Sequence, residues 1–433
     1  MCEAGISRKD SYRAFAASLS GTALEYYDFA TYGSFAALIF GRLFFPNANP
    51  LIGALQAFAA YGVGYAARPL GGIFFGRLGD VIGRKRVLVA TLLLIGIATF
   101  CIGLLPTYAQ AGIVAPVLLV TLRLAQGIGV GGEWGGAVLL SSEFASADQR
   151  GFWASAAQIG PPLGTLMANA VLALLATALP DQAFLAWGWR VAFLLSALLV
   201  AFGLWIRARL GETPVFLKLA AHERSTAPMS ELLASHKRGL LASILARIGP
   251  DVLYAMFAVF VLTYATQHLG LGRSQAVAAV VLGSALQAAA IPLAGWLSDR
   301  CGRRLIYLIG AIGAAVWSIA FFRFAHDAAS VTLGVVVGLV LQAVMYGPQA
   351  AFIAEQFPAR LRYTGSSLGY TFAGIVGGAI APFAFTYLLA KTGSGEPIGF
   401  YIAAANLFTL AGLALGRTVI DKADLVAVAR ERS

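Results

Sequence analysis

The sequence contains few charged residues. Only 12% of its 433 residues are Asp, Glu, Lys or Arg, whereas a soluble domain usually carries about twice that share. Long polar stretches are equally scarce, and the only one lies at residues 210–237. Apolar residues make up 59% of the chain, and the mean hydropathy is +0.78. This composition excludes an ordinary soluble protein and favours one embedded in lipid.

Cysteine is almost absent, and so are several catalytic signatures. Cys2, Cys101 and Cys301 lie in the N-terminal tail, an apolar run and a basic loop, a spacing that fits neither a disulfide framework nor a metal site. The lack of a Walker loop argues against an ATP-driven pump. The lack of zinc-site spacing and of a nucleophile elbow argues against a membrane enzyme. We therefore expect no enzymatic activity, no metal and no cofactor.

Apolar runs of membrane-spanning length follow one another along the chain. A hydrocarbon core of about 30 Å needs about 20 apolar residues per helical crossing. The first run contains two acids and lacks a cleavage site, so we predict a retained membrane helix and not a signal peptide. The pattern predicts an all-α integral membrane protein with twelve spans at about 14–38, 51–76, 87–106, 112–142, 151–178, 190–209, 238–266, 276–297, 305–323, 330–355, 363–390 and 399–420.

The basic residues are distributed unevenly between the loops. With the N-terminus inside, most of the 31 Lys and Arg residues fall in the segments on the cytoplasmic side of the twelve predicted spans. This positive-inside bias predicts that both termini are cytoplasmic. It also explains the formal net charge of +11 without a nucleic-acid partner.

Two loop sequences occur twice. GRLGDVIGRKR at 76–86 returns as GWLSDRCGRR at 295–304, and the Glu143–Arg150 spacing returns at Glu355–Arg362. Each pair occupies the same place in its half of the chain, which indicates an internal repeat. We predict three regions: an N-terminal six-helix bundle at 1–209, a cytoplasmic linker at 210–237, and a C-terminal six-helix bundle with a short tail at 238–433.

The repeated loop has the chemistry of a gate. Its glycines allow a tight turn. Asp80 with Arg84, and Asp299 with Arg303, could bridge to a neighbouring helix end and separate when the halves rock. We expect these four residues to act as gating residues that latch an outward-open state. The alternative is a basic loop that only sets topology.

Several motifs together resemble one family. GRLGDVIGRK resembles the signature loop of the major facilitator superfamily. EYYDF, ARPLGG, RLAQGIGVGGEWGG, WGWRVAFLLS and ETPVF resemble its metabolite:proton symporters, which include shikimate, α-ketoglutarate, citrate and proline/betaine permeases. FLAWGWRVAFLLS and TYATQHLGL are most similar to the shikimate-type branch. The resemblance implies two pseudo-symmetric six-helix bundles in the inner membrane. The Pro pair in QIGPPLG departs from the pattern and leaves exchange open beside symport.

Charged side chains within the predicted spans are candidates for the transport site. Such residues are costly in lipid, and they usually face a cavity, pair and act in transport. Seven are found: Glu25, Asp28, Arg68, Arg123, Glu133, Arg247 and Asp251.

Glu25 and Asp28 are candidates for proton coupling. They are three residues apart and therefore lie on one face of the first helix. Asp28 and Arg123 are predicted at similar depth near the midplane. A carboxyl group whose Arg partner is intermittent can bind and release a proton. The alternative is a permanent structural ion pair.

The predicted substrate site is cationic. Arg123 and Arg247 would bind a carboxylate, because a guanidinium matches it bidentately, although Asp251 could simply neutralise Arg247. Arg68 and Glu133 are predicted to pair near the inner gate. Polar side chains that could line the cavity are Tyr26, Tyr27, Tyr32, Gln158, Tyr254, Gln342 and Tyr346.

The predicted function is symport of a small organic acid with a proton by two rocking bundles. The expected partners are the organic anion, protons and the lipid bilayer, and we expect a monomer. A zwitterion permease of the proline/betaine kind is the second hypothesis. A non-transporting nutrient sensor on the same scaffold is the third, but such a sensor would be expected to lose the intramembrane charges.

Overall fold

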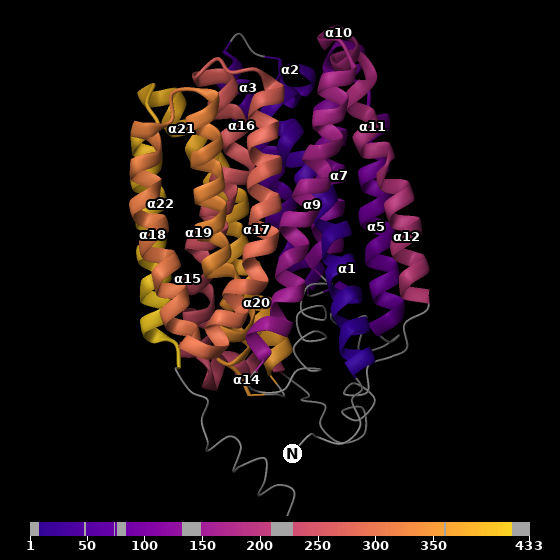
Figure 1. The fold of residues 1–433 in the computed structure, drawn as a ribbon. Helices are drawn as coiled ribbons and strands as arrows, with labels where there is room; N and C mark the ends of the chain where they lie inside the picture. Colours follow the sequence, from indigo (N-terminus) through magenta and orange to yellow (C-terminus); the bar gives the residue numbers. More distant parts are fainter. Residues whose placement is uncertain are drawn as a thin grey trace, which may run out of the picture.

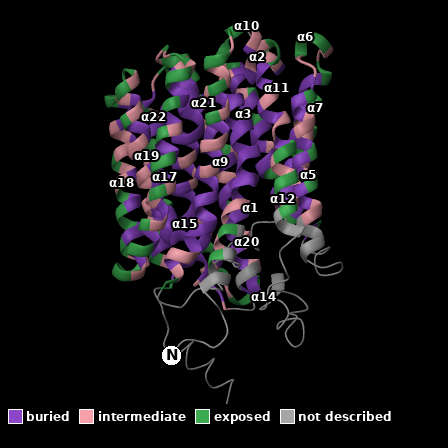
Figure 2. Ribbon diagram, turned by 45° about the vertical axis from the view of Figure 1, so that its right-hand side comes forward, coloured by how far each residue is buried: buried purple, intermediate pink, exposed green. Residues whose placement is uncertain are grey.

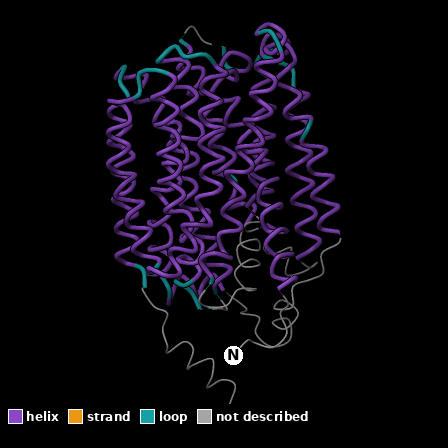
Figure 3. The backbone as a smooth tube through the Cα atoms, viewed as in Figure 1, coloured by secondary structure: helices purple, strands orange, loops and turns teal. Residues whose placement is uncertain are grey.

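The computed structural model describes residues 8–46, 49–72, 74–75, 84–131, 149–208, 228–358 and 361–417. In these ranges every regular element is a helix (Figure 3). The first half of the chain forms α1 (Arg8–Phe35), η1 (Ala36–Phe40), α2 (Gly41–Phe44), α3 (Pro50–Ala66), α5 (Arg84–Leu104), α6 (Tyr108–Ala111), α7 (Val114–Gly131), α9 (Arg150–Ala178), α10 (Asp181–Ala183), η2 (Phe184–Gly188), α11 (Trp189–Leu194) and α12 (Ser196–Ala208).

The second half begins with α14, whose eight residues lie inside the predicted linker. Elements marked η are π-helical turns, which interrupt longer helices and often occur at functional sites. The second half forms α14 (Pro228–Ser235), α15 (Lys237–Tyr254), η3 (Ala255–Phe260), α16 (Val261–Thr263), η4 (Tyr264–His268), α17 (Arg273–Cys301), α18 (Arg303–Phe324), α19 (Ala328–Ala354), α20 (Arg362–Gly374), η5 (Ile375–Ile380), α21 (Ala381–Thr392) and α22 (Glu396–Leu415).

The helices stand side by side in one upright bundle (Figure 1). Those of the first half lie on one side and those of the second half on the other, with α9 packed against α17 where the two sides meet. Helix α1 begins and α22 ends at the same end of the bundle, which we call the termini face. The other end is called the opposite face.

The outer surface of the bundle is apolar. Leu198 is 69% exposed, Ile113 68% and Leu293 65%. The buried residues are concentrated along the middle of the bundle (Figure 2). An exposed apolar surface of this extent suits lipid and not water, so the bundle presents its apolar side chains to a membrane.

Nine helical stretches in the described part of the chain are long and apolar enough to cross a membrane. Every one of the twelve predicted spans overlaps a helix, and the prediction of an all-helical fold is confirmed. The count of twelve spans stays a prediction. Most of the linker, and the tail beyond residue 417, lie outside the described residues, so the predicted domain boundaries also remain untested.

Candidate functional site

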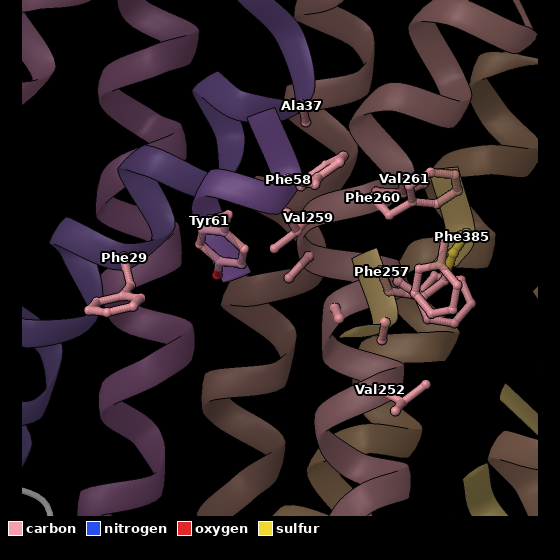
Figure 4. Close-up of a cluster of buried hydrophobic side chains, with 14 of the residues drawn as sticks. Phe29, Ala37, Phe58, Tyr61, Val252, Phe257, Val259, Phe260, Val261 and Phe385 are labelled. Atoms are coloured by element: carbon pink, nitrogen blue, oxygen red, sulfur yellow. The ribbon is translucent and has the colours of Figure 1, made fainter. Parts of the chain in front are cut away.

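A small cavity lies between the two halves of the chain. Its volume is about 30 Å³, which is room for about two water molecules. Tyr61 of α3 and Val259 of η3 approach each other there (Figure 4). The wall includes six tyrosines, two arginines, one carboxylate and one amide: Tyr26, Tyr61, Tyr65, Tyr254, Tyr346, Tyr370, Arg68, Arg247, Asp251 and Gln342. A metabolite would need this cavity to widen.

Arg247 of α15 is a buried cation with a carboxylate partner on its own helix. Its Nε donates to Asp251 at 2.8 Å. Its Nη1 donates to Gln349 Oε1 at 3.1 Å, and Gln158 of α9 donates to the same oxygen at 3.0 Å. Gln349 also donates to the Tyr307 hydroxyl at 2.8 Å. This network joins the two halves, and Asp251 offsets the charge of Arg247.

Arg68, which follows α3, is a buried cation that forms no ion pair with any residue the structure describes. Its Cζ lies 3.9 Å from the Tyr65 ring centroid and 4.5 Å from that of Phe29. Its Nη1 donates to the Tyr370 hydroxyl at 3.4 Å, and its Nε has no hydrogen-bond partner. Cation–π contacts are worth about 0.5–2 kcal/mol each, and burying a charge costs several kcal/mol. An anion in the cavity would therefore stabilise Arg68.

Tyr370 of α20 lies between the two cavity cations. Its ring centroid is 3.9 Å from the Arg247 Cζ and 5.8 Å from the Arg68 Cζ. Its hydroxyl contacts the hydroxyl of Tyr26, on α1 of the other half. A second contact between hydroxyl groups joins Tyr254 of α15 to Thr165 of α9. Tyrosine hydroxyls therefore close the cavity from both halves.

Two glycines of η5 let the cavity wall close tightly. A Cβ on Gly377 would clash with the side chain and backbone of Asp251, and one on Gly378 would clash with the ring of Tyr65. These two residues bring η5 against a residue of each half. A larger side chain at either position would push η5 away from the cavity.

A second polar cluster lies beside the cavity, inside the first half. Arg123 of α7 is fully buried and donates to Gln126 Oε1 at 2.7 Å and to the Tyr61 carbonyl at 3.3 Å. Gln126 donates to the Thr99 hydroxyl at 2.6 Å. Asp28 of α1 interacts with that same hydroxyl and lies in the electrostatic field of Arg123. A chain of polar contacts therefore connects the acid to the arginine.

Glu25 precedes Asp28 by almost one turn of α1 and is also buried. It lies in the electrostatic field of Arg68 and Tyr370. The two acids of α1 therefore face two different arginines, Glu25 the cavity cation Arg68 and Asp28 the cation Arg123.

A clamp joins the halves at the termini face. The Asp299 carboxylate accepts hydrogen bonds from the backbone N–H groups of Gly151 at 2.8 Å and Phe152 at 2.9 Å, in the first turn of α9. Arg303 donates to Asp299 at 2.9 Å and to Glu355 at 2.6 Å. Carboxylates at a helix N-terminus satisfy open N–H groups and complement the helix dipole. Asp299 thus bridges to the end of a neighbouring helix, and the gating role of Asp299 and Arg303 stays a prediction.

A larger cleft lies between the halves at the opposite face, with a volume of about 750 Å³. Arg273 of α17 and Asp181 of α10 lie in its wall and form an ion pair of 3.0 Å between the halves. Thr263 donates to the carbonyl of Ala37, another wall residue, at 3.0 Å. Thr263 lies one turn beyond Val259 of the cavity wall, so this contact separates the cleft from the cavity.

The structure brings together some predicted site residues and not others. Arg68, predicted at the inner gate, lines the cavity, whereas Arg123 and Gln158 lie behind its wall. Tyr27 is also outside the wall and donates to the Ala192 carbonyl at 2.7 Å. Tyr32 is not part of the wall either. The residues predicted to line the cavity that do so are Tyr26, Arg247, Tyr254, Gln342 and Tyr346. Asp80, Glu133 and the side chain of Arg84 lie outside the described residues.

Participants missed from the sequence include Thr99, Gln126, Gln349 and Tyr370, as well as the cavity-wall residues Tyr61 and Tyr65. The first three are polar residues inside apolar runs, which is a usable signal. Tyr370 carries no such signal, because tyrosine is common at membrane interfaces.

The chain was compared with known proteins. Residues 18–382 and 251–430 match the sequence model of the Major Facilitator Superfamily. The chain is 39% identical, over 92% of both chains, to the inner membrane metabolite transport protein YhjE of Escherichia coli K12. It is 37% identical, over 94% of both chains, to the shikimate transporter of the same strain. It is 32% identical, over 94% of this chain and 83% of the other, to the glycine betaine/proline/ectoine/pipecolic acid transporter OusA of Dickeya dadantii.

A solved D-xylose-proton symporter resembles the structure with a TM-score of 0.73, over 95% of this chain and 99% of the other. An inward-open structure of the xylose transporter XylE from E. coli gives the same TM-score at 17% identity, over 96% of this chain and 99% of the other. At such low identity these likenesses show the fold alone.

Proposed function

The chain belongs to the major facilitator superfamily and is a multi-pass inner-membrane transporter, not an enzyme, and from this premise we propose that it carries a small organic acid together with a proton. In this proposal twelve spans form two six-helix bundles that rock about the central cavity. Both termini are cytoplasmic, so the termini face is the inner face. The positive-inside bias of the loops supports that orientation.

One observation carries the proposal for an anionic substrate. Arg68 is a buried guanidinium in the cavity wall, without an ion pair in the described part of the chain and with an unused Nε–H group. A carboxylate entering the cavity could accept from this group and offset the charge. A charge-assisted hydrogen bond contributes about 1.5–3 kcal/mol. Arg247 contributes less to anion binding in this proposal, because Asp251 already neutralises it.

The tyrosines of the cavity wall would select the rest of the substrate. Their hydroxyl groups both donate and accept hydrogen bonds, and their ring faces pack against apolar ring atoms. A cyclic acid with several hydroxyl groups suits such a wall. The similarity to a shikimate transporter supports this class of substrate.

Asp28 is the proposed proton site. It is buried and lies outside the cavity wall, in a polar cluster with Thr99, Gln126 and Arg123. Burial favours the neutral acid, whereas the field of Arg123 favours the carboxylate. A movement of Arg123 relative to Asp28 would therefore bind or release a proton. The similarity of the fold to proton symporters is compatible with this role.

The two faces of the bundle would open in turn. At the inner face the Asp299 clamp must release before α9 and α17 separate. At the outer face the Arg273–Asp181 pair and the Thr263–Ala37 contact must release before the cleft reaches the cavity. The cavity holds about 30 Å³ when both sets of contacts are made, far less than a metabolite needs.

A zwitterion permease is the second candidate, because six tyrosines line the cavity. Aromatic rings bind quaternary ammonium groups through cation–π attraction, while Arg68 would bind the carboxylate. The similarity to OusA supports this reading. Exchange without a proton is the third candidate, favoured by the Pro161–Pro162 pair inside α9, of which Pro161 lines the cavity.

Uptake by proteoliposomes tests the proposal. Labelled shikimate, glycine betaine and proline are offered with an imposed pH gradient, with a membrane potential alone, and with neither. Symport of an acid predicts accumulation of shikimate under the pH gradient and alkalinisation outside as protons enter. Preferred uptake of glycine betaine would select the zwitterion reading. Uptake that responds only to substrate inside the vesicles would select exchange.

A further inference from the structure

One aromatic ring contacts both the arginine of the proposed proton site and the arginine of the proposed anion site. The Phe29 ring of α1 has the Arg68 Cζ 4.5 Å from its centroid and the Arg123 Cζ also 4.5 Å from its centroid. The two cations are therefore close neighbours that share one ring. Among the described residues, Phe29 is the only side chain whose ring lies under both guanidinium groups.

Both arginines lie against aromatic rings in addition to their hydrogen-bond acceptors. Arg68 Nε and Arg123 Nε are buried and have no hydrogen-bond partner in the described part of the chain. Arg68 also lies over Tyr65 and Tyr370, and Arg123 over Tyr32 and Tyr61. The electron-rich face of an aromatic ring attracts a guanidinium group. These rings therefore contribute to the positions of both charges, and Phe29 is the ring that the two arginines share.

We propose that Phe29 is the positioning residue that couples proton binding at Asp28 to anion binding at Arg68. This inference rests on the proposed symport. The charged or titratable groups around Asp28 in the described residues are Arg123 of α7 and Glu25 and Tyr27 of its own helix, with the Thr99 hydroxyl of α5 beside it.

The coupling follows from charge. When Asp28 is ionised, it offsets Arg123, and the field that reaches Arg68 is weak. When Asp28 binds a proton, the charge of Arg123 is no longer offset, and an anion beside Arg68 is held more strongly. The buried ring excludes water from the gap, so the field is poorly screened. By reciprocity the anion then favours the protonated acid by the same factor.

A matched pair of substitutions tests the role of the ring. Phe29→Leu keeps an apolar side chain but removes the shared ring face. Phe58→Leu makes the same change at a fully buried core residue of α3 that stacks on no arginine in the described part of the chain (Figure 4). Phe29→Tyr keeps the ring face. All three are assayed in proteoliposomes with labelled shikimate as the probe, for accumulation under a pH gradient and for counterflow without one.

We expect Phe29→Leu to lose about tenfold in the ratio of accumulation to counterflow, since coupling factors of about 5–150 are typical. Phe58→Leu and Phe29→Tyr should keep the wild-type ratio. An unchanged ratio in Phe29→Leu overturns the proposal. A loss in Phe29→Tyr as large as that in Phe29→Leu also overturns it, because the effect would then belong to packing.

A ligand-free measurement separates this inference from the proposed function. The melting temperatures of Asp28→Asn, Arg68→Gln and the double variant are measured in the wild-type and in the Phe29→Leu background. Coupled residues give non-additive shifts, so we expect non-additivity in the wild-type background and additivity in the Phe29→Leu background, where the shared ring is absent. Equal non-additivity in both backgrounds overturns the role of Phe29. Failure of wild-type vesicles to accumulate any probe would refute the proposed symport and leave this cycle to decide the coupling.

Discussion

The carboxylate of Asp299 accepts a hydrogen bond of 2.8 Å from the backbone N–H of Gly151, the second residue of a helix in the other half of the chain. The two residues lie where α17 and α9 are so close that a Cβ on Gly151 would meet the Gly295 carbonyl at 2.5 Å. Helix α9 is therefore capped by an acid of the other half of the chain. In the proposed transport cycle this cap must break before the termini face opens.

Removal of this cap should shift the protein toward the state that is open at the termini face. Asp299→Ala loses its two charge-assisted hydrogen bonds to α9, as well as the bond to Arg303 within its own half. Each bond to α9 is worth about 1.5–3 kcal/mol, so the open population should rise at least about tenfold. The open population is measured by labelling a cysteine introduced at position 155 of α9, which lies next to Gly295 of α17.

We expect Asp80→Asn to reduce transport more than Asp299→Asn, because the motif around Asp80 is the more complete copy.

The control is Asp327→Ala. Asp327 caps α19 by accepting from the Ser330 N–H at 2.8 Å, but both residues belong to the same half. Its loss should leave labelling at position 155 unchanged. Equal labelling in the Asp299 and Asp327 variants would remove the clamp from the account.

Replacement of Arg68 should weaken anion binding. Arg68→Gln keeps a polar side chain but removes the unpaired buried charge, and affinity for a carboxylate substrate should fall about ten- to hundredfold. The cost of burying that charge disappears, but the buried Glu25 loses the cation that it faces, so the melting temperature of the ligand-free protein should change little. Binding is followed by the thermal shift that the ligand produces.

Two other arginines serve as comparisons for Arg68. Arg323→Gln breaks an exposed pair with Glu396 and should change neither affinity nor stability measurably. Arg123→Gln should lower stability, because Gln126 and the Tyr61 carbonyl lose their partner. If only the Arg123 variant loses affinity for the carboxylate substrate, the anion binds at Arg123, as the sequence predicted, and not at Arg68.

The proposed orientation predicts opposite accessibility of two exposed positions. Arg42 lies in the wall of the cleft at the opposite face, and Arg300 in the last turn of α17 at the termini face. A cysteine at position 42 should react with an impermeant reagent added outside intact cells. A cysteine at position 300 should react only after the membrane is permeabilised. Reaction of both from outside would end the proposed topology.

The sequence predicted which polar residues lie within the spans, but not where their side chains point. A charge inside an apolar run is conspicuous, so Asp28, Arg68, Arg123 and Arg247 could all be found. Neighbouring residues on a helix point about 100° apart, and a span that is apolar on most sides gives little indication of its rotation. For this reason Tyr26 and Tyr27 could not be told apart, although only Tyr26 lines the cavity.

The position of Arg123 depends on a contact that no local pattern reports. A Cβ on Gly64 of α3 would meet the Arg123 Nη2 at 2.6 Å, so the guanidinium occupies space that this glycine leaves free. Arg123 therefore packs against α3 behind the cavity wall, and Arg68 is the arginine of the first half that lines the cavity. Such an exchange of roles between two arginines requires the packing of three helices to be known.

Accumulation by Asp28→Asn vesicles under an imposed pH gradient tests the central claim most directly. Asn resembles the protonated acid permanently, so no proton can be released and the gradient has nothing to drive. The account predicts that this variant fails to accumulate labelled shikimate but still exchanges it in counterflow, where no proton has to leave. Accumulation at the wild-type level under the same gradient would contradict the account.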